Sequence, residues 1–224
     1  MKHVFIINPT AGKRDCTARV MDMVKDLAAR RGLETECILT RQPGHAMETA
    51  GNLARSGQEV RLYACGGDGT MNEVANGAAG CANAAVTCIP VGTGNDFLKN
   101  FGDQAALFAD PENLWDGPVM PLDAIDCNGR LALTVACSGF DAQVADDVHT
   151  YGKLPLLGGQ GSYILSLGVN FLLRSLGRQW TITLDGETLE GEFALAAVCN
   201  GRYYGGGFMP VAEARMDDGV LNTL

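Results

Sequence analysis

Three short segments of the chain combine glycine with polar side chains in patterns that suit a phosphorylated ligand. They read Asn-Pro-Thr-Ala-Gly-Lys at residues 8–13, Gly-Gly-Asp-Gly-Thr-Met-Asn-Glu at 66–73 and Gly-Thr-Gly-Asn-Asp-Phe at 92–97. Glycine lets the backbone turn its N–H groups toward a phosphate, and the start of a helix adds a partial positive charge. We therefore expect a phosphate-binding site where these segments meet.

Two charged side chains in these segments have both a chemical and a structural interpretation. Asp68 would repel phosphates unless Mg²⁺ or an ordered water lies between them, whereas in a purely structural role it would cap a helix after a tight turn. Lys13 could neutralise phosphate charge or be an ordinary solvated lysine. The residues alone leave both alternatives open.

The glycine segments fall at the ends of predicted strands in a regular alternation of strands and helices. The hydrophobic pattern predicts strands over residues 4–7, 34–39, 60–65 and 86–91, and helices over 16–31, 44–55 and 71–79. Such alternation is typical of an α/β fold, a parallel sheet covered by helices on both faces. Ligands of these sheets bind beyond the carboxyl ends of the strands, which is where all three segments lie.

The pattern changes after about residue 115, where Pro118 and Pro121 indicate a linker. Short strands are predicted over 122–126, 131–137, 180–184 and 193–199, with a helix over 162–176. Asn128-Gly129 and Asp185-Gly186 are dipeptides favoured in hairpin turns. We therefore predict two domains, an α/β domain over residues 1–118 and a β-rich, sandwich-like domain over 119–224.

Composition excludes several classes of protein. The formal net charge of −9 argues against a nucleic-acid binder and against broad electrostatic attraction to anionic lipid. The eight cysteines include no Cys-x-x-Cys pair and no zinc-ligand spacing, and most lie in apolar runs, so we expect reduced, buried thiols in a cytosolic protein. The apolar segment before Asn8-Pro9 is too short for the pattern of a signal peptide, and no apolar stretch reaches about 18 residues, so we expect a soluble protein.

Taken together, the three glycine segments resemble the motifs of the diacylglycerol kinase and sphingosine kinase catalytic family, and its bacterial soluble lipid kinase branch in particular. The second half extends the resemblance, with Ser-Gly-Phe-Asp at 138–141, Asn-Gly-Arg-Tyr-Tyr-Gly-Gly-Gly at 200–207 and Asp-Asp-Gly at 217–219. The resemblance implies an NAD kinase-like, ATP-binding α/β domain followed by a β-sandwich-like lipid-binding domain, with the active site in the cleft between them.

The resemblance also implies roles for individual residues. Asp68 is the implied catalytic residue, acting through Mg²⁺ and water at the reacting phosphate. The carboxylate of Asp218 and the backbone carbonyls of Arg215 and Val220 are the implied ligands of a structural Mg²⁺. The implied ATP-binding residues are Asn8, Gly12, Lys13, Thr40, Gly66, Gly67, Asp68, Gly69, Thr70, Met71, Asn72, Thr93, Asn95 and Asp96.

The implied reaction transfers the γ-phosphoryl group of ATP to a lipid hydroxyl, foremost that of diacylglycerol, to give phosphatidic acid. Phosphatidylglycerol and sphingoid bases remain alternative acceptors. The implied protein is cytoplasmic, contacts a membrane surface transiently, and is open to homodimer formation. Apolar residues at helical spacing in the segment 163–173 could face a lipid tail or pack on the sandwich.

The chain departs from the family pattern near its C-terminus. Family members continue for roughly 70 to 80 residues, an ordinary fraction of a domain, and that tail carries an Asp-Gly-Glu motif taken as the catalytic base. Asp185-Gly186-Glu187 has the same letters, but we expect a hairpin turn there, so we expect a chain without its base and with an incomplete second domain. Two alternatives stay open: a nucleotide-binding module without catalysis, and an NAD kinase-like enzyme with a soluble acceptor.

Overall fold

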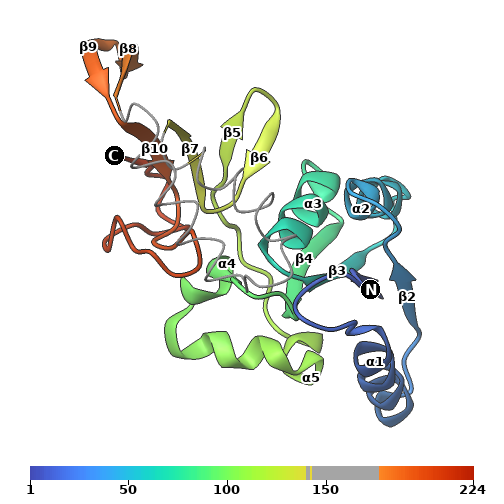
Figure 1. Cartoon of the computed structure of the whole chain (residues 1–224). Helices are drawn as coiled ribbons and strands as arrows, with labels where there is room; N and C mark the ends of the chain where they lie inside the picture. The colour runs from blue at the N-terminus through green and yellow to red at the C-terminus, as the bar shows by residue number, and fades with distance from the viewer. Residues whose placement is uncertain (140–141, 143–176) are drawn as a thin grey trace. The chain divides into compact units, whose positions relative to one another are not determined.

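The structure is a computed structural model that describes residues 1–139, 142 and 177–224 (Figure 1). The predicted helix over 162–176 and the end of the segment 138–141 lie outside the described residues. The chain forms two compact units, one of residues 1–134 and 200–220, the other of residues 135–199 and 221–224. The predicted domain boundary after residue 118 stays a prediction, because a compact unit need not coincide with a domain.

The first unit is built on a four-stranded parallel sheet, as predicted. Its strands are β1 (Lys2–Ile7), β2 (Thr35–Leu39), β3 (Val60–Gly66) and β4 (Ala84–Pro90), in the order β2-β1-β3-β4. Every residue of β3, and all but the first of β1, is buried. Central strands of a parallel sheet are covered on both faces, which explains why β1 and β3 are hydrophobic apart from Lys2, His3 and Arg61.

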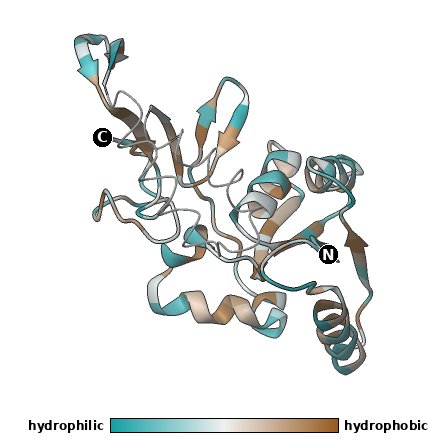
Figure 2. Cartoon of the chain, in the orientation of Figure 1, coloured by the Kyte–Doolittle hydropathy of each residue, from teal (hydrophilic) through white to brown (hydrophobic). Residues whose placement is uncertain are grey.

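Helices cover both faces of this sheet (Figure 1). The α1 helix (Thr17–Arg31) packs with Phe5 and Ile7 of β1, whereas α2 (His45–Arg55) and α3 (Asp68–Ala78) pack with Val4 and Ile6 of the same strand. Successive residues of a strand point to opposite faces, so one apolar strand supplies both cores. Figure 2 shows hydrophobic residues along the sheet and mixed polarity on the helices.

Short elements follow β4, and the sequence analysis did not predict them. They are α4 (Asp96–Lys99), the 3₁₀ helix η1 (Gly102–Ala109) and α5 (Pro111–Trp115). Elements this short have no measurable hydrophobic period. The α5 helix did carry a local signal, since Asp110 accepts a hydrogen bond from the backbone N–H of Glu112 and Pro111 occupies the first turn.

A hairpin of β5 (Ile125–Cys127) and β6 (Arg130–Ala132) also belongs to the first unit. Asn128 and Gly129 both have positive φ, 54° and 85°, which confirms the predicted turn. Asn76 of α3 anchors this hairpin, because its side chain exchanges two hydrogen bonds with the backbone of Leu131, 2.9 and 2.8 Å long. The hairpin is therefore tied to the helix that begins at the second glycine segment.

The second unit contains antiparallel strands. A sheet of order β11-β10-β7 joins β7 (Val135–Gly139), β10 (Leu195–Cys199) and β11 (Asn222–Thr223). A separate hairpin pairs β8 (Arg178–Leu184) with β9 (Glu187–Phe193). Its turn at Asp185 and Gly186 has φ values of 49° and 89°, so the predicted hairpin turn is confirmed.

The prediction of a single strand over 131–137 is wrong. The chain bends at residues 133–134 and separates β6 from β7. At this bend the carbonyl oxygen of Thr134 accepts hydrogen bonds from the backbone N–H groups of Asn200 and Gly201, each 2.8 Å long. A long-range contact therefore breaks a segment whose own composition is typical of a continuous strand.

Four of the eight cysteines, Cys16, Cys65, Cys88 and Cys199, are buried free thiols, whereas Cys127 is exposed, so the prediction of buried thiols holds for only part of the set. Burial raises the pKa of Cys88 to about 12, with the charge of Asp68 adding to the shift, and burial also raises the pKa of Cys65. These thiols therefore stay protonated at neutral pH. Among the described residues, no helix has the length and apolar character needed to cross a membrane.

Candidate functional site

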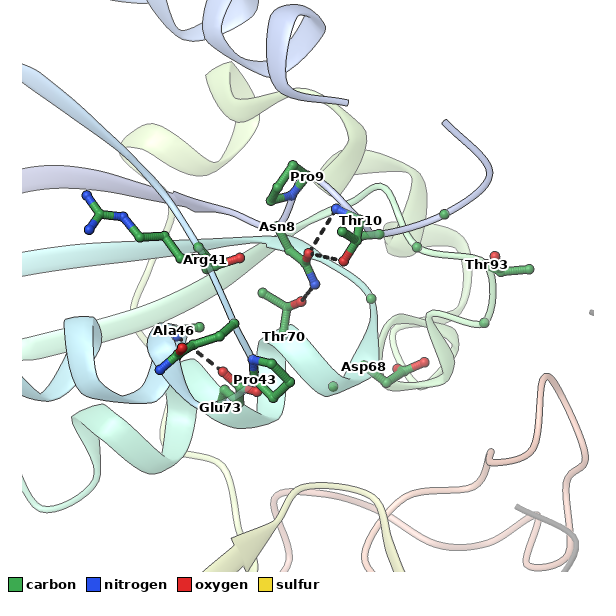
Figure 3. Close-up of a pocket in the computed structure, with 18 residues that line it drawn as sticks. Asn8, Pro9, Thr10, Arg41, Pro43, Ala46, Asp68, Thr70, Glu73 and Thr93 are labelled. Carbon is green, nitrogen blue, oxygen red and sulfur yellow. Dashed lines mark hydrogen bonds between the residues drawn. The ribbon is translucent and has the colours of Figure 1, made fainter. Parts of the chain in front are cut away.

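A cavity of about 550 Å³ lies in the first unit, at the carboxyl edge of its parallel sheet (Figure 3). Four segments line it, each directly after one of the four strands: residues 8–12, 40–46, 67–73 and 92–94. All three glycine segments contribute, together with the segment between β2 and α2. The sequence predicts this convergence, since the carboxyl ends of parallel strands meet at one edge.

Contact between the backbones of the glycine segments leaves no room for side chains. A Cβ atom on Gly92 would collide with the Cα of Gly67, and one on Gly12 would collide with the carbonyl oxygen of Val91. Gly12 also has a φ of 77°, which other residues rarely adopt. Glycine is therefore required for the three segments to form one continuous wall of backbone.

The N-terminus of α3 borders this wall with its N–H groups available. The helix begins at Asp68, three residues before the predicted start, because its N-cap Gly67 is still extended and turns directly from β3 into the helix. The first N–H groups of a helix have no partner within the helix, and no side chain in the described part of the chain caps this one. Gly67, Asp68, Gly69 and Thr70 all line the cavity. Such a helix start is suited to binding an anion.

Asn8 fastens the first glycine segment to the start of α3 (Figure 3). Its Oδ1 accepts hydrogen bonds from the backbone N–H and hydroxyl of Thr10, 3.0 and 2.8 Å long. Its Nδ2 donates to the hydroxyl of Thr70 at 3.1 Å. Because its amide is engaged in these contacts, Asn8 orients the loop around the cavity, and a direct contact of its side chain with a ligand stays a prediction.

Asp68 links the second glycine segment to the third. Its Oδ1 accepts a hydrogen bond from the backbone N–H of Phe97 at 2.9 Å, at the start of α4. Asn95, with a φ of 52°, turns that loop back by donating from its side chain to the carbonyl oxygen of Gly92 at 2.9 Å. Within the described part of the chain, Oδ2 of Asp68 has no hydrogen-bond partner. One carboxylate oxygen thus shapes the site while the other remains for a ligand.

The donor set fits a polyphosphate with Mg²⁺. Backbone N–H groups at the start of α3 supply hydrogen-bond donors and partial positive charge. The second oxygen of Asp68 supplies the hard ligand that Mg²⁺ prefers, and Mg²⁺ commonly takes its other ligands from phosphates and water. The close-packed glycine wall lets a phosphate approach the backbone directly.

Glu73 forms part of the cavity wall, and the sequence analysis did not single it out. Its Oε1 accepts a hydrogen bond from the N–H of Gly44 at 3.0 Å, and its Oε2 accepts one from the N–H of Ala46 at 3.2 Å. A detectable signal was its spacing, because a residue four positions after Gly69 on a helix lies on the same face. Arg41, Gln42 and Pro43 also line the cavity without having been predicted.

Of the residues predicted to bind ATP, eight line the cavity and six do not. Those lining it are Asn8, Gly12, Thr40, Gly67, Asp68, Gly69, Thr70 and Thr93. Those outside its lining are Lys13, Gly66, Met71, Asn72, Asn95 and Asp96. Gly66, Met71 and Asn95 instead surround a small void of about 10 Å³ next to Asp68. Nucleotide contacts for all fourteen residues stay predictions.

Asp96 is buried and has a structural partner far along the chain. Its carboxylate forms an ion pair with Lys99 and accepts a hydrogen bond from the N–H of Gly206 at 2.7 Å. Nearby, Oδ1 of Asn100 accepts a hydrogen bond from the N–H of Arg202 at 2.7 Å. Both contacts fasten the glycine-rich stretch 200–207 to α4, within the first unit.

The predicted structural metal ligands Arg215, Asp218 and Val220 lie away from the cavity lining. Oδ1 of Asp218 accepts a hydrogen bond from the N–H of Val220 at 3.0 Å, and Asp123 accepts one from the N–H of Gly219 at 2.7 Å. No group of three or more His, Cys, Asp or Glu side chains within the described ranges could hold a metal. One carboxylate with two backbone carbonyls and water fits Mg²⁺ chemically, and this site stays a prediction.

Comparison with known proteins identifies both parts of the chain. Residues 2–127 match the family model of the diacylglycerol kinase catalytic domain, and residues 134–224 match that of the YegS C-terminal NAD kinase beta sandwich-like domain. A probable lipid kinase YegS-like protein of Pseudomonas aeruginosa is 33% identical over 203 residues, covering 88% of this chain and 65% of that protein. A diacylglycerol kinase of Bacillus subtilis is 30% identical over 233 residues, covering 100% of this chain and 73% of that protein.

A solved structure supports the same assignment. The crystal structure of a putative diacylglycerol kinase from Bacillus anthracis has a TM-score of 0.73 and 28% sequence identity, covering 99% of this chain and 74% of that one. The predicted fold, a parallel-sheet α/β domain followed by a β-sandwich-like domain, is thereby confirmed. With its first family match extending over more than half of its residues, the chain belongs to the diacylglycerol kinase catalytic domain family.

Proposed function

We propose that the protein is an ATP-dependent lipid kinase that transfers the γ-phosphoryl group to the hydroxyl of diacylglycerol. The observation that carries this proposal is the single cavity formed by three glycine segments at the carboxyl edge of the sheet. The matched part covers 65% of the P. aeruginosa relative, so activity and substrate are proposed here for the protein rather than transferred from a name.

The nucleotide's phosphates would bind along the backbone of Gly12, Gly67 and Gly92 and at the start of α3. Gly12, Gly67 and the start of α3 supply N–H donors and a helix dipole, whereas the N–H of Gly92 donates to the carbonyl oxygen of Gly66 at 3.1 Å and holds the third segment against the second. The close backbone contacts fix these groups in place before the ligand arrives. When bound, Mg²⁺ would neutralise charge on the phosphates. Asp68 would orient that ion and its water through its second oxygen.

Phosphoryl transfer depends mostly on positioning and on charge stabilisation. This chain supplies positioning through Asn8, which holds the first loop on α3, and through Asp68, which holds the third loop. We propose a lipid as the acceptor because the relatives are named lipid kinases. Transient contact of a cytoplasmic protein with a membrane surface would deliver such an acceptor.

Calorimetry with ATP and Mg²⁺, combined with transfer from radiolabelled ATP, tests the proposal. Mixed micelles containing diacylglycerol should yield labelled phosphatidic acid, and NAD offered in parallel should yield no labelled NADP. Labelled NADP without lipid product would overturn the acceptor and favour an NAD kinase-like enzyme. ATP binding with no turnover on diacylglycerol, phosphatidylglycerol or sphingosine would replace the kinase with a nucleotide-binding module.

A further inference from the structure

Two helices begin at the cavity, and among the described residues side-chain oxygens cap the N-terminus of α2 but not that of α3. The N-cap of α2 is Gly44, which has a φ of 84° and no side chain of its own to cap the helix. Glu73 of α3 performs this function from outside the helix, since its Oε1 accepts a hydrogen bond from the N–H of Gly44 at 3.0 Å and its Oε2 accepts one from the N–H of Ala46 at 3.2 Å. Figure 3 shows the contact with Ala46. Over the part of the chain that the structure describes, no side chain accepts a hydrogen bond from the first N–H groups of α3.

This difference divides the cavity into two ends. A carboxylate on the α2 N-terminus satisfies its donors, offsets its partial positive charge and repels a second anion. The α3 N-terminus keeps its donors and its positive end for a ligand. The phosphates of a nucleotide therefore belong at the α3 end, and its nucleoside belongs beside the segment between β2 and α2.

Glu73 acts on a wall segment that has few other anchors. The backbone N–H of Thr40, directly after β2, donates to the carbonyl oxygen of Ile7 at the end of β1, which fixes the start of the segment. Pro43 has no N–H group, and Arg41 donates its own to Nδ1 of His45, next to Gly44. Glu73 thus connects the far end of this wall to the helix that carries the phosphate site.

We propose that Glu73 is a positioning residue that holds the wall 40–46 and sets the affinity for the nucleoside end of the ligand, without contacting the phosphates. The identity of the ligand rests on the proposed function. The role of Glu73 in holding the segment 40–46 in place does not depend on it. Glu73 is half-buried and lines the cavity. Its carboxylate is committed to two backbone donors, and this commitment is the physical basis of its role.

Three variants of the full chain test this role. Glu73→Ala removes both acceptors, and Glu73→Gln keeps one acceptor oxygen. Glu48→Gln is the matched control, because Glu48 is an exposed carboxylate in the first turn of α2, the helix that Glu73 caps, and lies outside the cavity lining. Calorimetry measures the dissociation constants of Mg²⁺ complexes of ATP and of inorganic tripolyphosphate, and amide hydrogen exchange measures the protection of Gly44 and Ala46.

We expect Glu73→Ala to weaken ATP binding about 10-fold, the effect of losing one or two hydrogen bonds, while tripolyphosphate affinity stays within about 2-fold. Exchange at Gly44 and Ala46 should accelerate about 10-fold, with Glu73→Gln intermediate and Glu48→Gln unchanged. Unchanged ATP affinity in Glu73→Ala, or an equal loss for tripolyphosphate, would overturn the positioning role.

The two measurements separate this inference from the proposed function. A wild-type chain that binds neither ATP nor tripolyphosphate would defeat the proposed function. In that case amide hydrogen exchange would still test whether Glu73 holds the segment 40–46 in place. Equal protection of Gly44 and Ala46 in wild type and Glu73→Ala would overturn that role.

Discussion

At the scale of single residues, several polar side chains of the site form hydrogen bonds that hold its loops and helices in place. Asn8 uses its amide to join two loops, and Asp68 uses one oxygen to hold a third. Glu73 caps a neighbouring helix with both of its oxygens. Replacing any of them therefore changes the position of the N–H groups that face the cavity, which is a larger effect than removing one contact.

Asp68 has two roles that a pair of substitutions can separate. Asp68→Asn keeps an oxygen that can accept the N–H of Phe97, but it removes the charge, whereas Asp68→Ala removes both. We expect both variants to lose at least about 100-fold in phosphoryl transfer, with Asp68→Asn retaining the wild-type free energy of unfolding. Turnover assays and urea unfolding measure the two effects. Undiminished turnover in folded Asp68→Asn would remove the charge from the mechanism.

His3 should make the stability of the first unit depend on pH. Its ring is buried, stacks on Trp115 with centroids 3.5 Å apart, and lies 2.8 Å from the hydroxyl of Tyr63. Desolvation, with a contribution from the charge of Arg61, lowers its pKa from 6.5 to about 4. The unfolded chain therefore binds the proton more readily than the folded chain between these two values.

The free energy of unfolding should consequently be highest above pH 6.5 and fall as the pH is lowered toward 4. The part due to His3 should reach at most about 3 kcal/mol. Urea unfolding from pH 4 to 8 measures this, with His3→Gln as the control, since glutamine can still hydrogen-bond but does not titrate. Identical pH profiles for wild type and His3→Gln would contradict the prediction.

At the scale of elements, the packing of α2 against α3 depends on a helical glycine outside the cavity. A Cβ atom on Gly77 would collide with the carbonyl oxygen of Met47 and lie 2.9 Å from Cβ of Ala50. We expect Gly77→Ala to reduce the free energy of unfolding by about 1–3 kcal/mol, as overpacking does. Gly69→Ala is the control on the same helix, because nothing lies within 4 Å of its added Cβ.

That control should be neutral or slightly stabilising, since alanine favours a helix over glycine by up to about 1 kcal/mol. Denaturant unfolding of the two variants side by side measures the difference. Equal effects on stability would show that the α2 and α3 backbones can separate without cost, which would contradict a tightly packed helix pair.

The elements also show which parts of the fold are predictable from sequence. The strand over 4–7 and the helix over 16–31 were found because long apolar patterns reflect burial, which dominates their energetics. The α4 helix was missed because its form depends on partners elsewhere: Asp68 accepts the N–H of Phe97, and Gly206 donates to Asp96. The sequence of α4 itself does not indicate these partners, because they lie far away along the chain.

The candidate site likewise has features that the sequence predicts and features that it does not. Its glycine segments were predicted because tight turns and close backbone contact require glycine, and the glycines can be read directly from the amino-acid sequence. The capping role of Glu73 was not predicted, because its partners Gly44 and Ala46 lie on another helix. The bend at Thr134 was also missed, since its cause is a contact with Asn200 and Gly201.

At the scale of the whole molecule, the first unit is built from two segments that are separated in the sequence. The chain leaves the first unit after Thr134 and returns to it from Asn200 to Val220. The returning segment is fastened by Asn200, which is fully buried and donates to the carbonyl oxygens of Asp123 and Leu133, each at 2.8 Å. The stretch 200–207 is consequently part of the unit that contains the cavity.

The net charge of −9 on the 224-residue chain leads to a prediction about membranes. A proposed lipid kinase must meet a lipid surface, yet a negative protein is repelled by anionic headgroups. We expect binding of the chain to vesicles rich in phosphatidylglycerol to stay constant or strengthen as salt rises from about 0.05 M to about 0.5 M, because salt screens repulsion as well as attraction. Vesicle co-sedimentation measures this binding, with neutral phosphatidylcholine vesicles as the reference.

The opposite salt dependence would identify a local basic patch that outweighs the overall charge. Lys13 and Arg14 are adjacent and both exposed, and they are the clearest candidates for such a patch. In that case the double substitution Lys13→Gln and Arg14→Gln should abolish the salt-sensitive part of the binding. Binding that weakens with salt in wild type and in the double variant alike would place the attraction elsewhere on the chain, and electrostatic repulsion would no longer describe how this protein meets a membrane.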